Sequence, residues 1–340
     1  MKNIIFNIFF AILFILGFYL GGFASFYADN PRFNLSANAA MTPDRESGNS
    51  SARLASLLSG TLAFDFGGET ESETEEKPAN PTTDYTTNVP VLASDSGEKV
   101  KIKNDTPYEV DIDELLAEPL VMHSDKMKVL ILHTHTSESY TPSEAYPYNM
   151  TDSYRTSDEE RNVVAVGNVI ERVLKESGID VIHDRTSHDY PSYTGSYRRA
   201  LETIDRNLAQ NPDITMVLDI HRDAIADGNG NYMKTEAVID GETCAQAMLV
   251  VGTDYGGLEH PNWRENLKYA LHIGQTMCKK YPSLAREIHL REERFNGHAR
   301  EGAMIIEVGS NGNTLDEALK CAEYVGDCIA SMITELSQPS

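Results

Sequence analysis

The chain has 340 residues, 41% of them hydrophobic, which is long enough for one sizeable domain with a buried core and extensions. The formal net charge of -23 disfavours sustained contact with nucleic acid or anionic lipid headgroups, because both carry charge of the same sign. The four cysteines include no CxxC pair and are too sparse for a disulfide scaffold. Composition therefore argues against a nucleic-acid partner and against a thiolate metal site.

The first segment of the chain, residues 1–26, is mostly apolar. It is long enough to cross a bilayer, which takes roughly 20 residues. Lys2 favours a cytoplasmic N-terminus, which would place the rest of the chain outside the cytoplasm. The alternative is a signal peptide cleaved near Phe23-Ala24-Ser25, but the apolar run exceeds the ~7–15 residues of a signal-peptide core. The sequence therefore predicts a transmembrane anchor.

Residues 27–98 differ in composition from what precedes and follows them. They are rich in Ser, Thr, Asn, Pro, Gly and acidic residues, including an acidic run at 69–76. Such a segment buries too little apolar surface to offset the entropy of ordering it. We expect a disordered acidic linker outside the cytoplasm, followed by a catalytic domain over 99–340.

From residue 99 onward, strand-like and helix-like segments alternate. A short strand at 100–102 and a short helix at 111–116 come first. The predicted strands are then 129–132, 180–182, 214–220, 236–240, 247–251 and 303–308, and the predicted helices are 158–177, 197–210, 262–280 and 315–336. This order is typical of an α/β fold with a mostly parallel central sheet flanked by helices on both faces. Ligands of such sheets bind beyond the carboxyl ends of the strands.

Histidines follow two of the predicted strands. His133 and His135 come after the strand at 129–132, and His221 ends the strand at 214–220. Imidazole is a good zinc ligand, and its second nitrogen can be oriented by a neighbouring acceptor. A single histidine is more often structural, but two strand ends that both carry histidine favour a metal site at the carboxyl edge of the sheet.

Two acidic residues lie at related positions. Glu307 ends the last predicted strand, where a buried carboxylate needs a cation or another partner. That partner is either a metal-bound water or an arginine such as Arg222 or Arg300. Glu160 stands in the acidic first turn of a predicted helix, before an apolar stripe, so its side chain can face either the sheet edge or solvent.

In order and local context, these residues resemble the zinc-dependent N-acetylmuramoyl-L-alanine amidases. That superfamily has a His after a strand, a Glu leading a helix, a His ending a strand, and a catalytic Glu before Gly and Ser-Asn. The matching positions are His135, Glu160 before Asn162-Val163-Val164, Asp219-Ile220-His221, and 306–311. The resemblance implies a zinc hydrolase with its site at the carboxyl edge of the sheet.

A closer resemblance is to the stage II sporulation protein P family. The segments that carry it are 133–140, 184–186 and 219–223, with a lead-in at 105–120. The likeness covers about residues 100–332 together with the arrangement of anchor and linker. It implies one Zn²⁺ per chain, held by His135, Glu160 and His221, and a catalytic general base, Glu307. Two histidines and a glutamate leave the fourth zinc position open for water.

One departure from the superfamily concerns the first ligand. The usual Gly-His-Gly turn is replaced by His133-Thr134-His135, so either histidine is a possible ligand. The distance from the strand end favours His135. His133 and Arg222 are then candidates for substrate contact or for stabilising the developing oxyanion.

The resemblance also implies a biological setting. The substrate would be peptidoglycan, cleaved at the N-acetylmuramoyl-L-alanine amide, with possible endopeptidase activity on crosslinked stem peptides. The role would be septal wall degradation and engulfment during endospore formation, in the space between the two membranes of the sporulating cell. Stage II sporulation proteins D and M would be partners.

Two other readings of the same residues stay open. A zinc peptidase acting mainly on stem peptides would use the same metal and the same base. A wall-binding scaffold would keep the fold without catalysis, but it would be expected to lack a ligand or the base, and all four candidates are present.

Overall fold

The computed structural model describes residues 89–92, 97–121, 124, 126–149 and 153–336. These residues belong to one compact unit, Thr83–Ser340; the other unit, Met1–Thr82, lies outside the described residues. The anchor predicted at 1–26 and most of the predicted linker lie outside them too. Within the described ranges, no helix is both long enough and apolar enough to cross a membrane.

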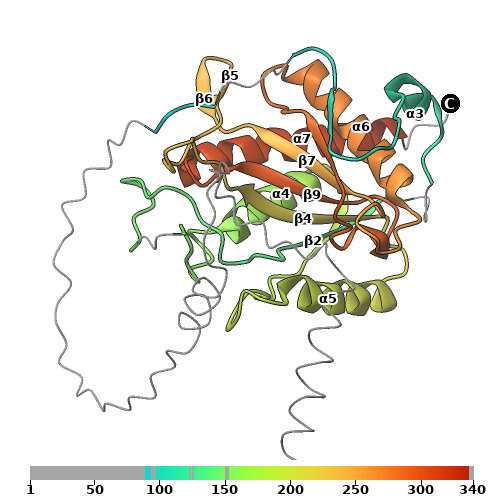
Figure 1. Cartoon of the computed structure of the whole chain (residues 1–340), viewed down its shortest axis with the longest axis horizontal. Coiled ribbons are helices and arrows are strands. Elements are labelled where there is room, and N and C mark those ends of the chain that lie inside the picture. The colour runs from blue at the N-terminus through green and yellow to red at the C-terminus, as the bar shows by residue number, and fades with distance from the viewer. Residues whose placement is uncertain (1–88, 93–96, 122–123, 125, 150–152, 337–340) are drawn as a thin grey trace, which may run out of the picture. The chain divides into compact units, whose positions relative to one another are not determined.

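A central sheet of seven strands organises the described part of the chain (Figure 1). Its strands are β1 (Ile102–Asn104), β2 (Lys128–Leu132), β3 (Asp180–His183), β4 (Met216–Asp223), β7 (Ala247–Gly252), β8 (Ile288–Arg291) and β9 (Ala303–Ser310). The spatial order is β1-β8-β7-β9-β4-β2-β3. Neighbouring strands run parallel except β7 and β9, which are antiparallel. The prediction of a mostly parallel sheet is therefore confirmed.

Helices cover both faces of this sheet. They are α3 (Ile112–Ala117), α4 (Val163–Glu176), α5 (Ser196–Gln210), α6 (Trp263–Lys280) and α7 (Leu315–Leu336), with the 3-10 helix η1 (Gly297–Ala299). Apolar side chains of α4, α6 and α7 form the main core against one face. Ala200 and Ile204 of α5 pack on the other face, against Leu130, Leu132 and Val217. Figure 1 shows α5 on the opposite side of the sheet from α4 and α7.

A hairpin lies apart from the central sheet. Its strands β5 (Ala237–Ile239) and β6 (Glu242–Cys244) pair antiparallel across Asp240-Gly241. Both turn residues have positive φ, 54° and 82°, which is the conformation that closes tight hairpins. The strand predicted at 236–240 is therefore one half of this hairpin and not part of the main sheet.

The start of α4 differs from the prediction. The helix begins at Val163, and the side chain of Asn162 caps it by accepting the Val164 N–H at 2.9 Å. Asp158 instead accepts the N–H of Glu160 at 3.0 Å in a turn that precedes the helix. Glu160 consequently lies before α4 and not in its first turn.

Candidate active site

The alternation of side chains along β4 and β9 decides which residues meet. Val217 belongs to the core under α5, so Asp219 and His221, two and four residues on, point to that same face. Glu307 of β9 is the register partner of His221. The two side chains are therefore neighbours on the α5 face, at the carboxyl ends of two central strands.

The turn after β2 brings His135 to this pair. The carboxylate of Asp219 accepts the backbone N–H of Thr134 at 2.7 Å and its hydroxyl at 2.6 Å, which fixes the turn to β4. The rings of His135 and His221 then lie edge to face, with centroids 5.3 Å apart. Both histidines are buried. Three of the predicted site residues, His135, His221 and Glu307, are thus brought together.

A carboxylate that the sequence analysis did not single out completes this group. Glu138 is buried, and its Oε2 lies 3.2 Å from His221 Nδ1. Burial alone would raise the pKa of Glu138, but the charge and hydrogen bond of His221, with Arg222 beside it, hold that pKa well below its usual range. Glu138 is an ionised acid three residues after His135.

Glu160, in contrast, stands apart from the group. Its side chain is 89% exposed and lies 3.8 Å from the guanidinium of Arg161. The expectation that Glu160 faces the sheet edge depended on a helix starting at Asp158, and α4 starts one turn later. Glu138 takes the place of Glu160 as the acidic candidate ligand. The signal for it was its position in the turn that follows His135.

His133 is separated from the group by the sheet itself. It continues the alternation of Ile131 and points to the α4 face, where Gly167 leaves room for its ring. Its Nδ1 donates to the carbonyl of Ile220 at 3.0 Å, and its Nε2 lies 2.8 Å from Nε2 of His183. Burial and the neighbouring His183 lower the pKa of His133 to about 3. Both nitrogens are engaged, so His133 is not placed to contact substrate.

Arg222 also forms hydrogen bonds with the surrounding loops. It is buried, and its guanidinium donates to the carbonyls of Ser139 at 2.9 Å and Ser153 at 3.0 Å. The other arginine considered as a partner of Glu307, Arg300, donates to backbone carbonyls 2.8 and 2.7 Å away. Among the described residues, neither guanidinium forms an ion pair with Glu307. The reading of Glu307 as half of a structural salt bridge is therefore not supported.

Glu307 has the electrostatics of a proton acceptor. Burial raises its pKa to about 8; His221 opposes this shift, and Asp223 and Glu138 add to it. Its Oε2 is buried and has no hydrogen-bond partner among the described side chains and backbone. A carboxyl group that titrates near neutrality is suited to general acid–base work.

With this geometry established, comparison with known proteins places the chain. Residues 56–330, most of the sequence, match the family described as stage II sporulation protein P. The chain belongs to that family. The family membership predicted from the motifs is confirmed. A member of the family from Bacillus subtilis (strain 168) is 28% identical over 219 residues, which is 61% of this chain and 51% of that protein. The chain spans about half the length of this relative.

Solved structures outside the family show a weaker likeness. N-acetylmuramoyl-L-alanine amidase AmiC2 of Nostoc punctiforme has 12% identity and a TM-score of 0.36, covering 62% of this chain and 96% of the amidase. The CwlD amidase from Clostridioides difficile, in complex with the GerS lipoprotein, has 12% identity and a TM-score of 0.40, covering 62% and 98%. Fold likeness alone does not fix function, so these structures do not establish the activity of this chain.

The donor set of this family member suits zinc in its chemistry. Two imidazoles and a carboxylate, from His135, His221 and Glu138, are ligand types that zinc takes. His221 is buried, and its Nε2 lies 2.9 Å from Asp219 Oδ1, so a carboxylate faces this ring nitrogen. In the described part of the chain, no three His, Cys, Asp or Glu side chains stand in a ready metal-binding arrangement. The residue types fit, and the side chains would have to adjust to hold an ion.

The N-terminal end of α5 covers His135. The ring of Tyr193 stacks on the imidazole at 4.3 Å, and its hydroxyl lies 3.0 Å from Nε2. Ser196 Oγ lies 3.3 Å from Nδ1 of the same ring. Arg155 lies over Tyr193 at 4.8 Å and forms ion pairs with Glu138 and Asp189. These contacts come from segments that the sequence analysis did not connect to the site.

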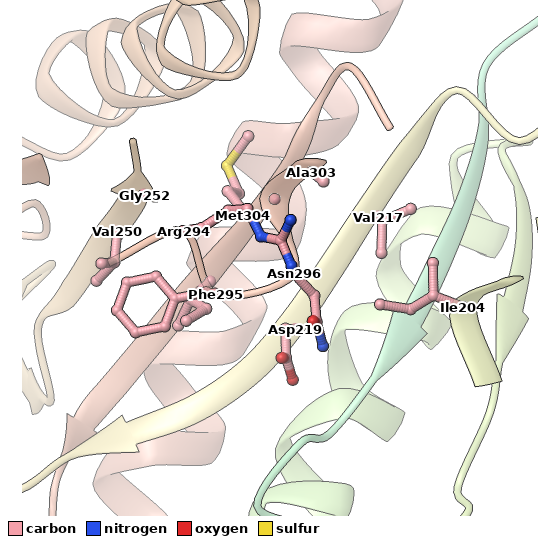
Figure 2. Close-up of a pocket in the computed structure, with 12 residues that line it drawn as sticks. Ile204, Val217, Asp219, Val250, Gly252, Arg294, Phe295, Asn296, Ala303 and Met304 are labelled. Carbon is pink, nitrogen blue, oxygen red and sulfur yellow. The ribbon is translucent and has the colours of Figure 1, made fainter. Parts of the chain in front are cut away.

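A small cavity adjoins the site on the α5 face (Figure 2). Asp219, Val217 and Phe295 are among the residues that line it, and it encloses about 20 Å³. That volume has room for about one water molecule. The cavity is therefore too small for a sugar or a peptide.

Proposed function

We propose that this member of the stage II sporulation protein P family is a zinc-dependent peptidoglycan hydrolase. It cleaves the amide bond between N-acetylmuramic acid and L-alanine. His135, Glu138 and His221 hold the zinc ion, and Glu307 is the general base. The observation that carries the proposal is the buried Glu307 carboxyl, with its raised pKa, beside two histidines and an ionised glutamate.

Each residue contributes a separate part of the chemistry. A zinc ion held by these ligands would supply Lewis acidity, which would lower the pKa of water and polarise the scissile carbonyl. Glu307 takes a proton from the attacking water through its unpartnered Oε2 and returns it to the leaving amine. A cation nearby favours the ionised form of a carboxyl group, so the pKa of about 8 falls once the site is charged. Glu307 is then a base at neutral pH.

Asp219 has a supporting part in this mechanism. It holds the turn of His135 through Thr134 and lies next to His221, so it fixes the two histidines relative to each other. Outer carboxylates of this kind orient ligands and raise their basicity. His133 and Arg222 stabilise the β2 and β4 ends without reaching the reacting atoms.

The setting of the reaction stays a prediction from family resemblance. This applies to engulfment, to the partners named stage II sporulation proteins D and M, to endopeptidase activity on crosslinked stem peptides, and to an anchored, extracytoplasmic location. The residues of the site are equally compatible with a zinc peptidase that acts on stem peptides. Only the bond that is cut separates the two activities.

Product analysis tests the proposal. The full chain, purified in detergent with zinc, is incubated with isolated peptidoglycan, and soluble products are identified by mass spectrometry. We expect intact stem peptides with a free L-alanine amino end, and none with the Glu307→Gln variant. Stem peptides that have been shortened or have lost their crosslinks, but are still attached to the glycan, would establish a peptidase instead. Zinc binding without any product would favour a scaffold.

A further inference from the structure

Arg286 lies beside the first residue of β7, in the segment that leads into β8. Ala285 pairs with Ala247 in a parallel bridge, and the backbone N–H of Arg286 donates to the carbonyl of Ala247 at 2.8 Å. Ala285 and Ala247 both belong to the main core, on the side of the sheet that α4, α6 and α7 cover. Because successive side chains of an extended segment alternate, Arg286 points to the opposite face, which is the α5 face.

The side chain of Arg286 ends at the carboxyl end of β4. Its Nη1 donates to Asp223 Oδ2 at 2.7 Å. Asp223 follows His221 by two residues, and the extra residue of the irregular β4–β9 pairing is in β9, so β4 keeps its alternation. Arg286 therefore reaches past the ends of β7 and β9, on the face that carries His221 and Glu307. Figure 1 shows β7, β9 and β4 side by side.

The guanidinium of Arg286 is only partly used by the fold. The side chains of Arg286 and Asp223 are 16% and 23% exposed, so the pair lies at the rim of the site. Among the described residues, Asp223 is the one hydrogen-bond partner of this side chain, which leaves the N–H groups of Nε and Nη2 without an acceptor. A guanidinium carries five donors in a fixed fork that matches a carboxylate. Asp223 thus orients a group that can bind a second carboxylate.

Other arginines near the site are engaged elsewhere. Arg222 donates to backbone carbonyls, and Arg155 forms ion pairs with Glu138 and Asp189. The site is itself rich in carboxylates, so an acidic peptide would be repelled unless a cation faced its charge. Arg286 is the cation placed for that purpose.

The spacing along β4 indicates which carboxylate this is. His221 and Asp223 are two residues apart, which is about 7 Å in a strand. An extended peptide advances roughly 3.5 Å per residue. We infer that Arg286 is a substrate-binding residue that holds the carboxylate of the second residue of the stem peptide, next to the L-alanine whose amide is cut. This inference rests on the proposed function, because it names the part of the peptide that the same site recognises.

The test compares two synthetic stem tripeptides that differ in one group. The carboxylate of the second residue is free in one and amidated in the other, and their affinities for the full chain, in detergent with zinc, are measured by calorimetry. We expect the native chain to bind the free acid about 10- to 100-fold more tightly, as a charge-assisted hydrogen bond would give. Arg286→Gln should bind both peptides equally, and Arg286→Lys should keep part of the preference.

Arg172→Gln is the matched control. Arg172 also pairs with a carboxylate, that of Glu176, but it belongs to α4 on the other side of the sheet. We expect this variant to keep the native preference for the free acid.

Two results would overturn the role of Arg286. One is a native chain that binds both tripeptides equally or binds neither. The other is an Arg286→Gln variant that loses the same factor in affinity for both, because a salt bridge that only stabilises the fold has that effect. Product analysis with muramoyl peptides, run alongside, separates this inference from the proposed function. A preference for the free acid without release of stem peptides would support the carboxylate site and overturn the proposed amidase.

Discussion

At the ends of β2 and β4, the two faces of the sheet carry similar side chains that differ in their hydrogen bonding. On the α4 face, His133 has partners on both ring nitrogens, the Ile220 carbonyl and His183. On the α5 face, Glu307 Oε2 is buried with no hydrogen-bond partner among the described residues, and His221 lies between two carboxylates, Glu138 and Asp219. An unpaired buried polar atom costs about 1–3 kcal/mol, so an unsatisfied group persists where function requires it.

Residue type alone therefore does not separate a structural histidine from a functional one. His133 and His135 are two positions apart, and the fold sends them to different sides of the sheet. The strand alternation carries His133 to the core under α4, and the turn tied to Asp219 carries His135 to the α5 face. The satisfied face stabilises the fold, and the unsatisfied face is the candidate for catalysis.

The largest expected effect comes from Glu307→Gln on the unsatisfied face. The amide has nearly the shape of the carboxylate but cannot accept a proton, so turnover should fall by about 10²- to 10⁴-fold. Zinc content, measured by atomic emission, should stay at the native level, because the proposal makes Glu307 the base and not a ligand. A variant that loses zinc and activity together would make Glu307 a ligand and contradict its assigned role.

The next effect distinguishes two glutamates. Glu138→Gln removes the charge of the proposed acidic ligand beside His221, and we expect zinc affinity to fall by about 100-fold or more, since even outer-shell changes cost about 10- to 100-fold. Glu160→Gln is the matched control, because its side chain is 89% exposed. We expect no change in its affinity in a chelator competition. The reverse result would restore Glu160 as the ligand.

The smallest effect is on stability, and it compares the two histidines directly. His133→Leu removes the partner of the Ile220 carbonyl and of His183 Nε2, so unfolding by urea should show a loss of about 1–3 kcal/mol with zinc binding retained. His135→Leu should lose zinc binding and change stability less. If His133→Leu were the variant that lost zinc, the division between the two faces would be wrong.

Much of the fold could be predicted from the sequence, because apolar strands and amphipathic helices alternate strongly from Val129 onward. The start of α4 could not be predicted in this way. Asp158 and Asn162 are both good helix N-caps, and the choice between them depends on tertiary contacts of the preceding turn. Because the helix begins after Asn162, Glu160 lies outside the site. Strand β8 was missed because it is short and ends in a charged residue.

The site residues at strand ends could be predicted from the sequence, and the site residues in loops were missed. His135, His221 and Glu307 follow apolar strands, so parallel alignment alone brings them to one edge. Glu138 is defined as a site residue by its burial against His221, and Tyr193 reaches His135 from a loop before α5. Neither contact leaves a periodic pattern in the sequence.

Zinc-edge anomalous diffraction from crystals of the protein grown with zinc is the most direct test of the central claim. The account predicts one ion on the α5 face, bound by His135, Glu138 and His221, with Glu307 close by. An ion bound at His133 or at Glu160, or no ion on that face at saturating zinc, would contradict it.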